Sequence, residues 1–232
     1  MSLPSSYARV RRVNSFHELI STRFENGVNA LCWERTLPGD FGEIVNLLGT
    51  DIGITTLEEN QLLQLPISAA GKIAVGILLE DQRLLREHGL DPVLDYVNGY
   101  LPNDDPSPLR TDVCSFHVDT ATAEADTWLC TYHGASSEGL PNEDAQRHVD
   151  IPGTRAALLK HCGGEDNAEF LEYLSDHSFD LHYAPAPHAR PYSFGPSNLW
   201  RIAVDYPDCL VPPCIHRAPD PIPGQPRLLL IS

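Results

Sequence analysis

The chain has no hydrophobic run long enough to cross a membrane. Its longest apolar segment, PISAAGKIAVGILL, is short for a span and contains Lys72. The first residues, MSLPSSYARVRRV, include basic side chains but no apolar stretch behind them, so we expect no signal peptide. These absences predict a soluble, cytoplasmic protein without a membrane partner.

Basic residues are scarce as well. The sequence has 16 Lys and Arg against 32 Asp and Glu, which gives a net charge of -16. A polyanion repels nucleic-acid phosphates and anionic membrane surfaces, so we expect neither as a partner. The acidic residues are spread along the chain without a run of five like charges, which is typical of a solvated surface.

Cysteines are few, and familiar catalytic motifs are missing. The six cysteines are dispersed and none forms a Cys-x-x-Cys pair, so we expect reduced thiols that pack as small apolar groups. The chain has no Gly-x-Ser-x-Gly elbow, no Gly-rich phosphate loop and no dinucleotide fingerprint. These absences argue against a serine hydrolase and against a nucleotide-binding enzyme.

The length and composition fit one compact domain of above-average size, with 232 residues of which 42% are hydrophobic. We predict that residues 1–105 are mainly helical. Ser15 with Glu18 forms a capping box, Asp40 can cap a helix over FGEIVNLL, and residues 67–89 have helical spacing. DPVLDYVNGYL is predicted as a further helix, and NALCWER as a short strand.

Residues 106–232 differ in character. After the Pro- and Asp-rich stretch PNDDPSPLRTD come short β-like runs, VCSFHV, TWLCTYHG, LWRIAVDY, CLVPPCIH and RLLLIS, with one acidic helical insert, EDNAEFLEYLSDH. The fold class predicted is therefore α+β. A C-terminal antiparallel sheet pair or barrel of jelly-roll type packs against an N-terminal helical layer.

The tripeptide His-Val-Asp occurs twice. Side chains two apart on a strand share a face, so His117 and Asp119, in an apolar setting, can present an imidazole and a carboxylate together. His148 and Asp150 have polar and turn-forming flanks, and we expect them to be solvent-exposed on a loop or at a helix end. The first copy is the better candidate for a metal site.

Two residues near the C-terminus strengthen this interpretation. His216 ends an apolar run, and ten residues separate it from Arg227. Two histidines and one carboxylate form the facial triad of non-haem ferrous oxygenases, which leaves positions open on the metal. Arg227 can bind the far carboxylate of 2-oxoglutarate with its planar fork. The sequence thus predicts iron at His117, Asp119 and His216.

Other residues offer weaker candidates. Thr131 and Tyr132 could donate a hydroxyl to the 2-oxoglutarate carboxylate, although ordinary strand packing explains them equally well. We expect Arg217 to form a structural ion pair. His177, His182 and His188 lie in a Pro-rich acidic segment where exposed side chains are expected.

A rival site uses sulfur. Cys209, Cys214 and His216 have the pattern Cys-x4-Cys-x-His, and with His117 they could give zinc four tetrahedral ligands. The Pro-Pro pair before Cys214 makes the backbone irregular there, so apolar packing of both cysteines is favoured.

The stretches RTDVCSFHVD, TYHGASSEGLPNED and HRAPDPIPGQPRLLL resemble an uncharacterised group, domain-of-unknown-function family 1826, and NALCWERTLP resembles its N-terminal signature. Roughly the last 125 residues also look like the double-stranded β-helix of ferrous iron and 2-oxoglutarate-dependent dioxygenases. The resemblance implies iron at His117, Asp119 and His216, with 2-oxoglutarate at Arg227. One departure is Gly139, where an aromatic residue is expected before Leu-Pro-Asn.

Two functions from different classes follow. The first is an iron- and 2-oxoglutarate-dependent oxygenase that hydroxylates a small molecule or a protein side chain. The alternative is a jelly-roll protein that holds zinc with the same triad and catalyses nothing. A third possibility keeps the fold but gives the His and Asp side chains a purely structural role.

Overall fold

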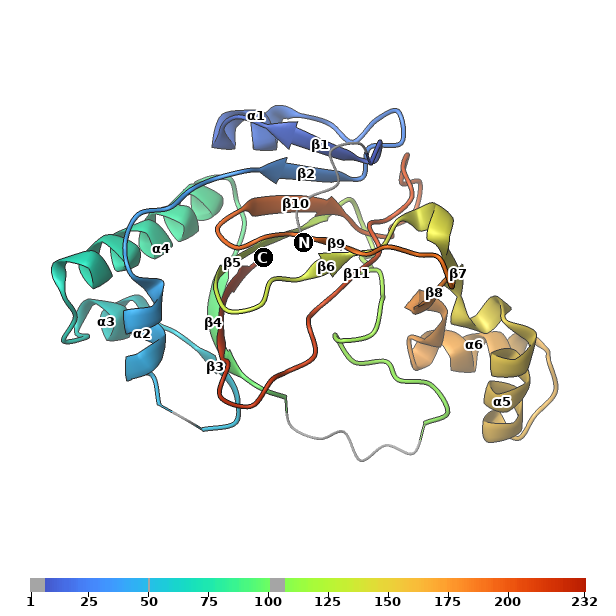
Figure 1. Ribbon diagram of the computed structural model, residues 1–232. Helices are drawn as coiled ribbons and strands as arrows, with labels where there is room; N and C mark the ends of the chain where they lie inside the picture. The colour runs from blue at the N-terminus through green and yellow to red at the C-terminus, as the bar shows by residue number, and fades with distance from the viewer. Residues whose placement is uncertain (1–6, 50, 101–106) are drawn as a thin grey trace.

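The computed structural model describes residues 7–49, 51–100 and 107–232. Its largest element is a seven-stranded sheet (Figure 1) in which all neighbouring strands are antiparallel except the first two. In spatial order the strands are β1 (Val10–Val13), β2 (Ala30–Trp33), β10 (Leu199–Ala203), β5 (Asp126–His133), β12 (Arg227–Ile231), β4 (Val93–Asn98) and β3 (Gly53–Thr56).

Two smaller sheets come from the C-terminal half. One has the order β11 (His216–Arg217), β6 (Glu138–Gly139) and β9 (Tyr192–Ser193), and the other pairs β7 (Ala145–Arg147) with β8 (Tyr183–Pro185). A buried cluster between the large and the three-stranded sheet includes Leu129, Trp200, Tyr192 and Phe194. The strands form separate sheets and not one closed barrel.

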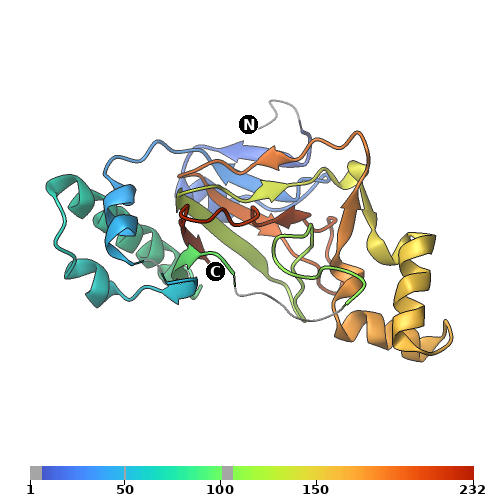
Figure 2. The ribbon, with the colours of Figure 1, turned by 60° about the horizontal axis from the view of Figure 1, so that its bottom comes forward.

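Helix α1 (Phe16–Ser21) lies beside β1 and β2 at one edge of the large sheet, and the other helices form two groups at opposite ends of the molecule (Figures 1 and 2). One group consists of α2 (Phe41–Leu47), α3 (Glu59–Leu63) and α4 (Ala69–Glu87). At the other end are α5 (Pro152–Cys162) and α6 (Ala168–Asp176), with the short 3-10 helices Asn142–Asp144, His148–Asp150 and Phe179–Leu181 nearby in the chain. No helix of the described ranges is long and apolar enough to span a membrane.

Local signals explain several helix starts. The Ser15 hydroxyl accepts a hydrogen bond from the amide of Glu18, and the Asp40 carboxylate accepts one from the amide of Glu43, so both N-caps are confirmed. The Glu18 carboxylate accepts from the amide of Asn14 and not from that of Ser15, so the predicted capping box is only half formed. The predicted helix over residues 67–89 is α4, which begins after Ser68 and is followed by Gly89 in a left-handed conformation.

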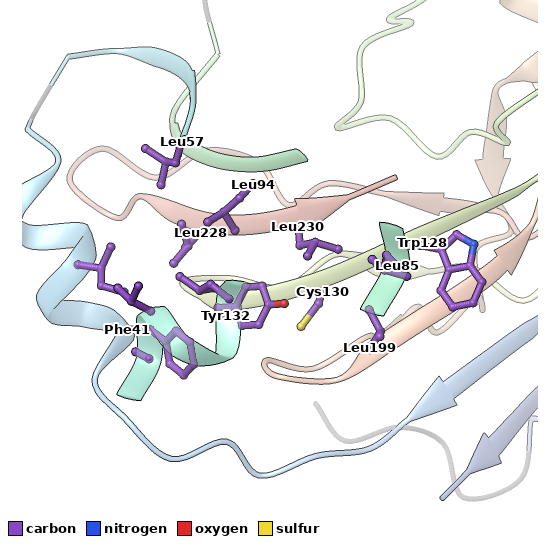
Figure 3. Close-up of a cluster of buried hydrophobic side chains, with 14 of the residues drawn as sticks. Phe41, Leu57, Leu85, Leu94, Trp128, Cys130, Tyr132, Leu199, Leu228 and Leu230 are labelled. Carbon is purple, nitrogen blue, oxygen red and sulfur yellow. The ribbon is translucent and has the colours of Figure 1, made fainter. Parts of the chain in front are cut away.

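The main core lies between the large sheet and the helices. Figure 3 shows Phe41 of α2 beside Tyr132 of β5, with ring centroids 5.4 Å apart. Tyr132 also donates its hydroxyl to Asp81 of α4 at 2.6 Å, and Asp81 pairs with Arg35 at 2.7 Å. These buried polar groups connect the helical layer to the sheet. Leucines are the most frequent other members of this core, among them Leu85, Leu94, Leu228 and Leu230.

The prediction of a helix over DPVLDYVNGYL is wrong. Residues 93–98 form β4, which pairs with β12 on one side and β3 on the other. Leu94 and Tyr96, two apart, are both buried in the helix-facing core, which is strand periodicity. The predicted division is therefore incomplete, because residues 1–100 supply four of the seven strands as well as helices. The predicted boundary between residues 105 and 106 lies outside the described residues.

Candidate metal centre

Backbone pairing brings the predicted ligands together. His117 forms an isolated antiparallel bridge with His216 at the start of β11, and each amide donates to the other residue's carbonyl at 2.9 Å. Residues directly opposite in such a pair point to the same face. The two imidazoles consequently lie together, with ring centroids 4.6 Å apart.

Asp119 joins this face because the segment alternates. Phe116 and Val118 are buried in a separate apolar cluster with Ile215, whereas His117 and Asp119 point the other way. The predicted strand VCSFHV is reduced to a single bridge residue, His117, which pairs with His216 and with His182. The alternation of side chains expected from the sequence is nevertheless present.

The three side chains have the spacing of a metal-ligand set. Asp119 Oδ1 lies 3.7 Å from His117 Nε2, and Asp119 Oδ2 lies 3.6 Å from His216 Nε2. One ligand atom from each residue lies within 4.8 Å of the other two. Two imidazoles and one carboxylate so close together could hold a divalent metal ion on one side and leave the opposite side open.

Each ligand is oriented by a hydrogen bond. His117 Nδ1 lies 2.8 Å from the carbonyl of Ser115, and His216 Nδ1 lies 3.3 Å from that of Cys214. A carbonyl can only accept, so both Nδ1 atoms carry the proton and both Nε2 lone pairs are available. Thr127 donates its hydroxyl to Asp119 Oδ2. Such outer contacts fix ligand orientation and tune ligand basicity.

The local electrostatics favour the metal-binding protonation states. Burial and the neighbouring His216 lower the pKa of His117, so this imidazole is neutral near pH 7. Burial pushes the pKa of Asp119 upward, but His216, the Thr127 hydroxyl and His117 outweigh it, and the pKa lies below its ordinary value. A metal requires a neutral imidazole and an ionised carboxylate.

Arg227 is buried, with 5% of its surface exposed, at the start of β12. Its side chain donates to the carbonyl of Ala135 at 2.7 Å, the Tyr100 hydroxyl at 3.3 Å and the Ser137 hydroxyl at 3.2 Å. Within the described ranges no ion pair joins it to a carboxylate. Burial lowers its pKa. A guanidinium has five N–H donors, so three partners leave capacity for an anion.

Arg227 is connected to the triad through two intermediate residues, Ser137 and Phe194. The carbonyl of Ser137, whose hydroxyl accepts from Arg227, also accepts the amide of Phe194 at 2.9 Å. The Phe194 ring stacks on His216 at 6.4 Å. Leu228 and Leu230 face the helices, so alternation turns Arg227 to the other face of β12, toward the three-stranded sheet.

The two predicted hydroxyl donors, Tyr132 and Thr131, lie on opposite faces of β5. Tyr132 lies on the helix-facing side of β5 with its hydroxyl bonded to Asp81, so the structure does not bring it to the triad or to Arg227. Thr131 is buried on the opposite face of β5, the face that Leu129 shares. The hydroxyls that contact Arg227 are instead those of Tyr100 and Ser137.

The second His-Val-Asp copy is not part of the site. Residues 148–150 form a 3-10 helix. Asp150 is exposed, as expected from the flanks, but His148 is half-buried, so the expectation is wrong for the histidine. His177 and His188 are exposed too, but the same expectation is wrong for His182, which is only 4% exposed. Its contacts with the segment around His117 bury it, and nothing in its local sequence indicates them.

The alternative sulfur ligands do not gather around a metal position. All six cysteines are free thiols, and the one group of possible metal ligands found among the described residues is the triad. Cys214 is buried beside Tyr192 in the cluster between the large and the three-stranded sheet, and Cys209 contacts the carbonyl of Val211. Arg217 pairs with Glu138 at 2.8 Å, so its predicted structural role is confirmed.

Close packing explains why position 139 is a glycine. A Cβ atom there would lie 2.2 Å from the ring of Tyr192, so the tyrosine ring occupies the space that a side chain at position 139 would need. Gly139 pairs with His216 on one side and Tyr192 on the other. The aromatic residue expected at position 139 is absent, and an aromatic ring from β9 lies against the glycine instead.

A cavity of about 500 Å³ has Tyr100 in its lining. Prolines and tyrosines line much of it, and none of the triad residues does. The evidence for the candidate centre is therefore the chemistry of its side chains, because this cavity does not include them.

The chain matches no family model, and no curated protein and no solved structure matches it.

Several residues of the centre could not be found from the sequence. Ser115, Thr127, Tyr100 and Ser137 are common residue types at no diagnostic spacing, and each acts through contacts made only in the folded chain. The triad itself could be found, because the order His-x-Asp, His and Arg is an unusual combination.

Proposed function

We propose that this protein is a ferrous iron and 2-oxoglutarate-dependent oxygenase. The observation that carries the proposal is Arg227, a buried guanidinium held by neutral oxygens near a two-histidine, one-carboxylate group. A buried arginine without a carboxylate is costly in the free protein unless an anion completes its environment. The distal carboxylate of 2-oxoglutarate is such an anion.

The strand order supports a double-stranded β-helix. After β4 the chain alternates between two sheets: the His117 segment pairs beside β11, β5 returns to the large sheet, and β6 and β9 lie in the small one. Next β10 is in the large sheet, β11 in the small one and β12 in the large one. This alternation is the connectivity of a jelly roll. The likeness to domain-of-unknown-function family 1826 stays a prediction.

The residues have distinct roles in this proposal. His117, Asp119 and His216 would hold the iron, while Arg227, with Tyr100 and Ser137 beside it, would hold the distal carboxylate. Iron and 2-oxoglutarate supply oxidation by dioxygen, in which one oxygen atom enters the substrate C–H bond, the other enters succinate, and carbon dioxide is released. The protein orients both reagents, and the carbonyls of Ser115 and Cys214 orient the two imidazoles.

Zinc binding without catalysis is the second candidate, because zinc also accepts two histidines and a carboxylate. It uses the same triad but gives no role to Arg227, which has no carboxylate partner among the described residues. Whether Arg227 contributes to 2-oxoglutarate binding therefore distinguishes the oxygenase from the zinc protein.

The proposal is tested with anaerobic protein, ferrous ion and 2-oxoglutarate. We expect a weak visible charge-transfer band that requires all three, and slow conversion of 2-oxoglutarate to succinate when air is admitted. His148→Ala, in the other His-Val-Asp copy, should behave like the wild type, whereas His117→Ala should show neither signal. Folded, iron-loaded wild type that gives no band and no succinate would exclude the oxygenase and leave metal binding alone.

A further inference from the structure

A third histidine lies beside the candidate metal ligands. His117 forms antiparallel bridges with His216 on one side and with His182 on the other. Residues paired in this way share a face, so the three imidazoles form a row in the order His216, His117, His182. The ring centroids of His117 and His182 are 5.6 Å apart.

Ser115 orients two imidazoles of this row. Its carbonyl accepts from His117 Nδ1, and its hydroxyl lies 2.8 Å from His182 Nδ1. The same hydroxyl donates its one proton to the carbonyl of Asp112 at 2.7 Å, so it must accept from His182. The proton of His182 is therefore on Nδ1, and its Nε2 carries a lone pair.

The Nε2 atom of His182 has no hydrogen-bond partner among residues 7–49, 51–100 and 107–232, although 96% of the residue is buried. This Nε2 atom is also not among the fully buried polar atoms that lack a hydrogen-bond partner, so it is accessible to a small molecule such as water.

His182 is too far along the row to be a ligand. The ligand atoms that lie within 4.8 Å of one another come from His117, Asp119 and His216 alone. Neighbouring strands are about 4.8 Å apart, so His182 stands roughly one strand spacing beyond His117, on the side away from His216. That distance suits a hydrogen bond to a molecule next to the metal position.

We propose that His182 is a positioning residue whose Nε2 accepts a hydrogen bond from a donor beside the metal position, a water molecule in the substrate-free protein and an N–H or O–H group of the substrate. The inference rests on the metal centre proposed above. It assigns a ligand class to that side of the centre: a hydrogen-bond donor is accepted there, and an anion is disfavoured because it would face a lone pair.

Zinc-loaded protein labelled with 15N in histidine tests this role without any turnover. Long-range 1H–15N spectra distinguish protonated, lone-pair and metal-bound ring nitrogens. On addition of Zn²⁺ we expect the Nε2 signals of His117 and His216 to take metal-bound positions. A water molecule bound to Zn²⁺ is more acidic than free water and therefore a stronger hydrogen-bond donor. The Nε2 signal of His182 should consequently make a smaller upfield shift, as for a lone pair that accepts a stronger hydrogen bond, while that of exposed His177 stays unchanged.

The outcomes are separable. If His117 and His216 respond and His182 does not, the positioning role is wrong and the metal centre stands. If neither His117 nor His216 responds, the proposed centre itself fails. A metal-bound signal at His182 would make it a ligand and would also overturn the inference.

Two variants complete the test. Ser115→Ala removes the hydroxyl that orients His182 but keeps the carbonyl that orients His117, so only the His182 ring should populate both tautomers. His182→Leu removes one hydrogen bond, which is worth about two- to tenfold in Zn²⁺ affinity. A loss as large as that caused by His216→Leu would contradict a positioning role.

Discussion

At the scale of single residues, the environment of Arg227 separates the candidate functions. Buried arginines usually lie beside carboxylates, whereas the described partners of Arg227 are a carbonyl and two hydroxyls. These acceptors hold the guanidinium in place without neutralising its charge. A dicarboxylate ligand would supply the missing negative charge.

Arg227→Ala should therefore weaken 2-oxoglutarate binding while metal affinity stays almost constant, because arginine is no metal ligand. A hydrogen bond between charged groups contributes roughly 1.5–3 kcal/mol, which corresponds to about ten- to a hundredfold in the dissociation constant. Arg227→Lys should give an intermediate value, since it keeps the charge but loses the planar fork. Calorimetric titration with a redox-inert metal in the centre measures both affinities.

The matched control is Tyr132→Phe, which removes a hydroxyl that points away from the centre toward Asp81. It should leave 2-oxoglutarate affinity unchanged. Unchanged affinity in Arg227→Ala would remove the main reason to favour an oxygenase over a zinc protein.

Residue types determined what the sequence could predict at this scale. His117, Asp119, His216 and Arg227 have chemically specific side chains in a specific order, so they could be singled out. His182 could not, because its burial and its alignment with His117 come from a bridge between segments 65 residues apart, as the numbering shows. The sequence offers Thr131 and Tyr132 as two adjacent hydroxyl donors for 2-oxoglutarate. Neighbours on a strand face opposite ways, so the fold places the two hydroxyls on opposite faces of β5.

At the scale of elements, the buried network of Arg35, Asp81 and Tyr132 connects α4 to β5. Arg35 and Asp81 have side chains only 6% and 4% exposed. The same β5 strand continues from Asp126 to His133 and places Thr127 under Asp119. The helical layer thereby supports the strand that orients the carboxylate ligand.

Asp81→Ala should strongly destabilise the fold, because it leaves a buried guanidinium without its partner. Breaking a buried ion pair in this way costs about 3–5 kcal/mol. Chemical denaturation of the metal-free protein measures the loss. Glu80→Ala, one position away on α4 and paired at the surface with Arg83, is the matched control and should leave stability nearly unchanged. Equal effects in the two variants would contradict a structural role for the network.

Elements with clear local signals were predicted well. Long amphipathic α4 has a serine cap and a glycine stop, and β5, β10 and β12 are β-rich runs between turns. The β4 strand was missed because Asp91 and Pro92 resemble a helix start, and its strand character depends on pairing with β12, which is more than a hundred residues away. Non-local pairing of this kind has no signature in the local sequence.

At the scale of the whole molecule, metal-free protein should lose stability in mild acid. The pKa of His182 is lowered to about 4 by burial, and those of His117 and His148 are lowered as well, all from an ordinary value of 6.5. Below pH 6.5 the unfolded chain takes up protons that the folded protein resists. The stability contributed by these neutral rings is thus complete above pH 6.5 and is lost as the pH falls toward 4.

Thermal unfolding across this pH window should show a falling midpoint, and the fall should be smaller in His182→Gln. His188→Gln changes an exposed ring and should leave the slope as in the wild type. A midpoint that is constant or rises on acidification would contradict the buried, neutral state of His182.

The metal centre is also a property of the whole molecule. Its ligands come from the loop before β5 and from β11, which are nearly a hundred residues apart, and the large sheet carries Arg227 at a third point of the chain. The sequence order suggested that these segments meet, but only the pairing of His117 with His216 brings them into contact.

The most direct test of this account is a titration of metal-free protein with Co²⁺, followed by its visible spectrum, in the wild type and four variants. Wild type and His148→Ala should bind one ion per chain with the same affinity. His117→Ala, Asp119→Ala and His216→Ala should each lose that binding while remaining folded by circular dichroism. Binding that persists unchanged in Asp119→Ala, or that is lost equally in His148→Ala, would contradict a metal centre at His117, Asp119 and His216.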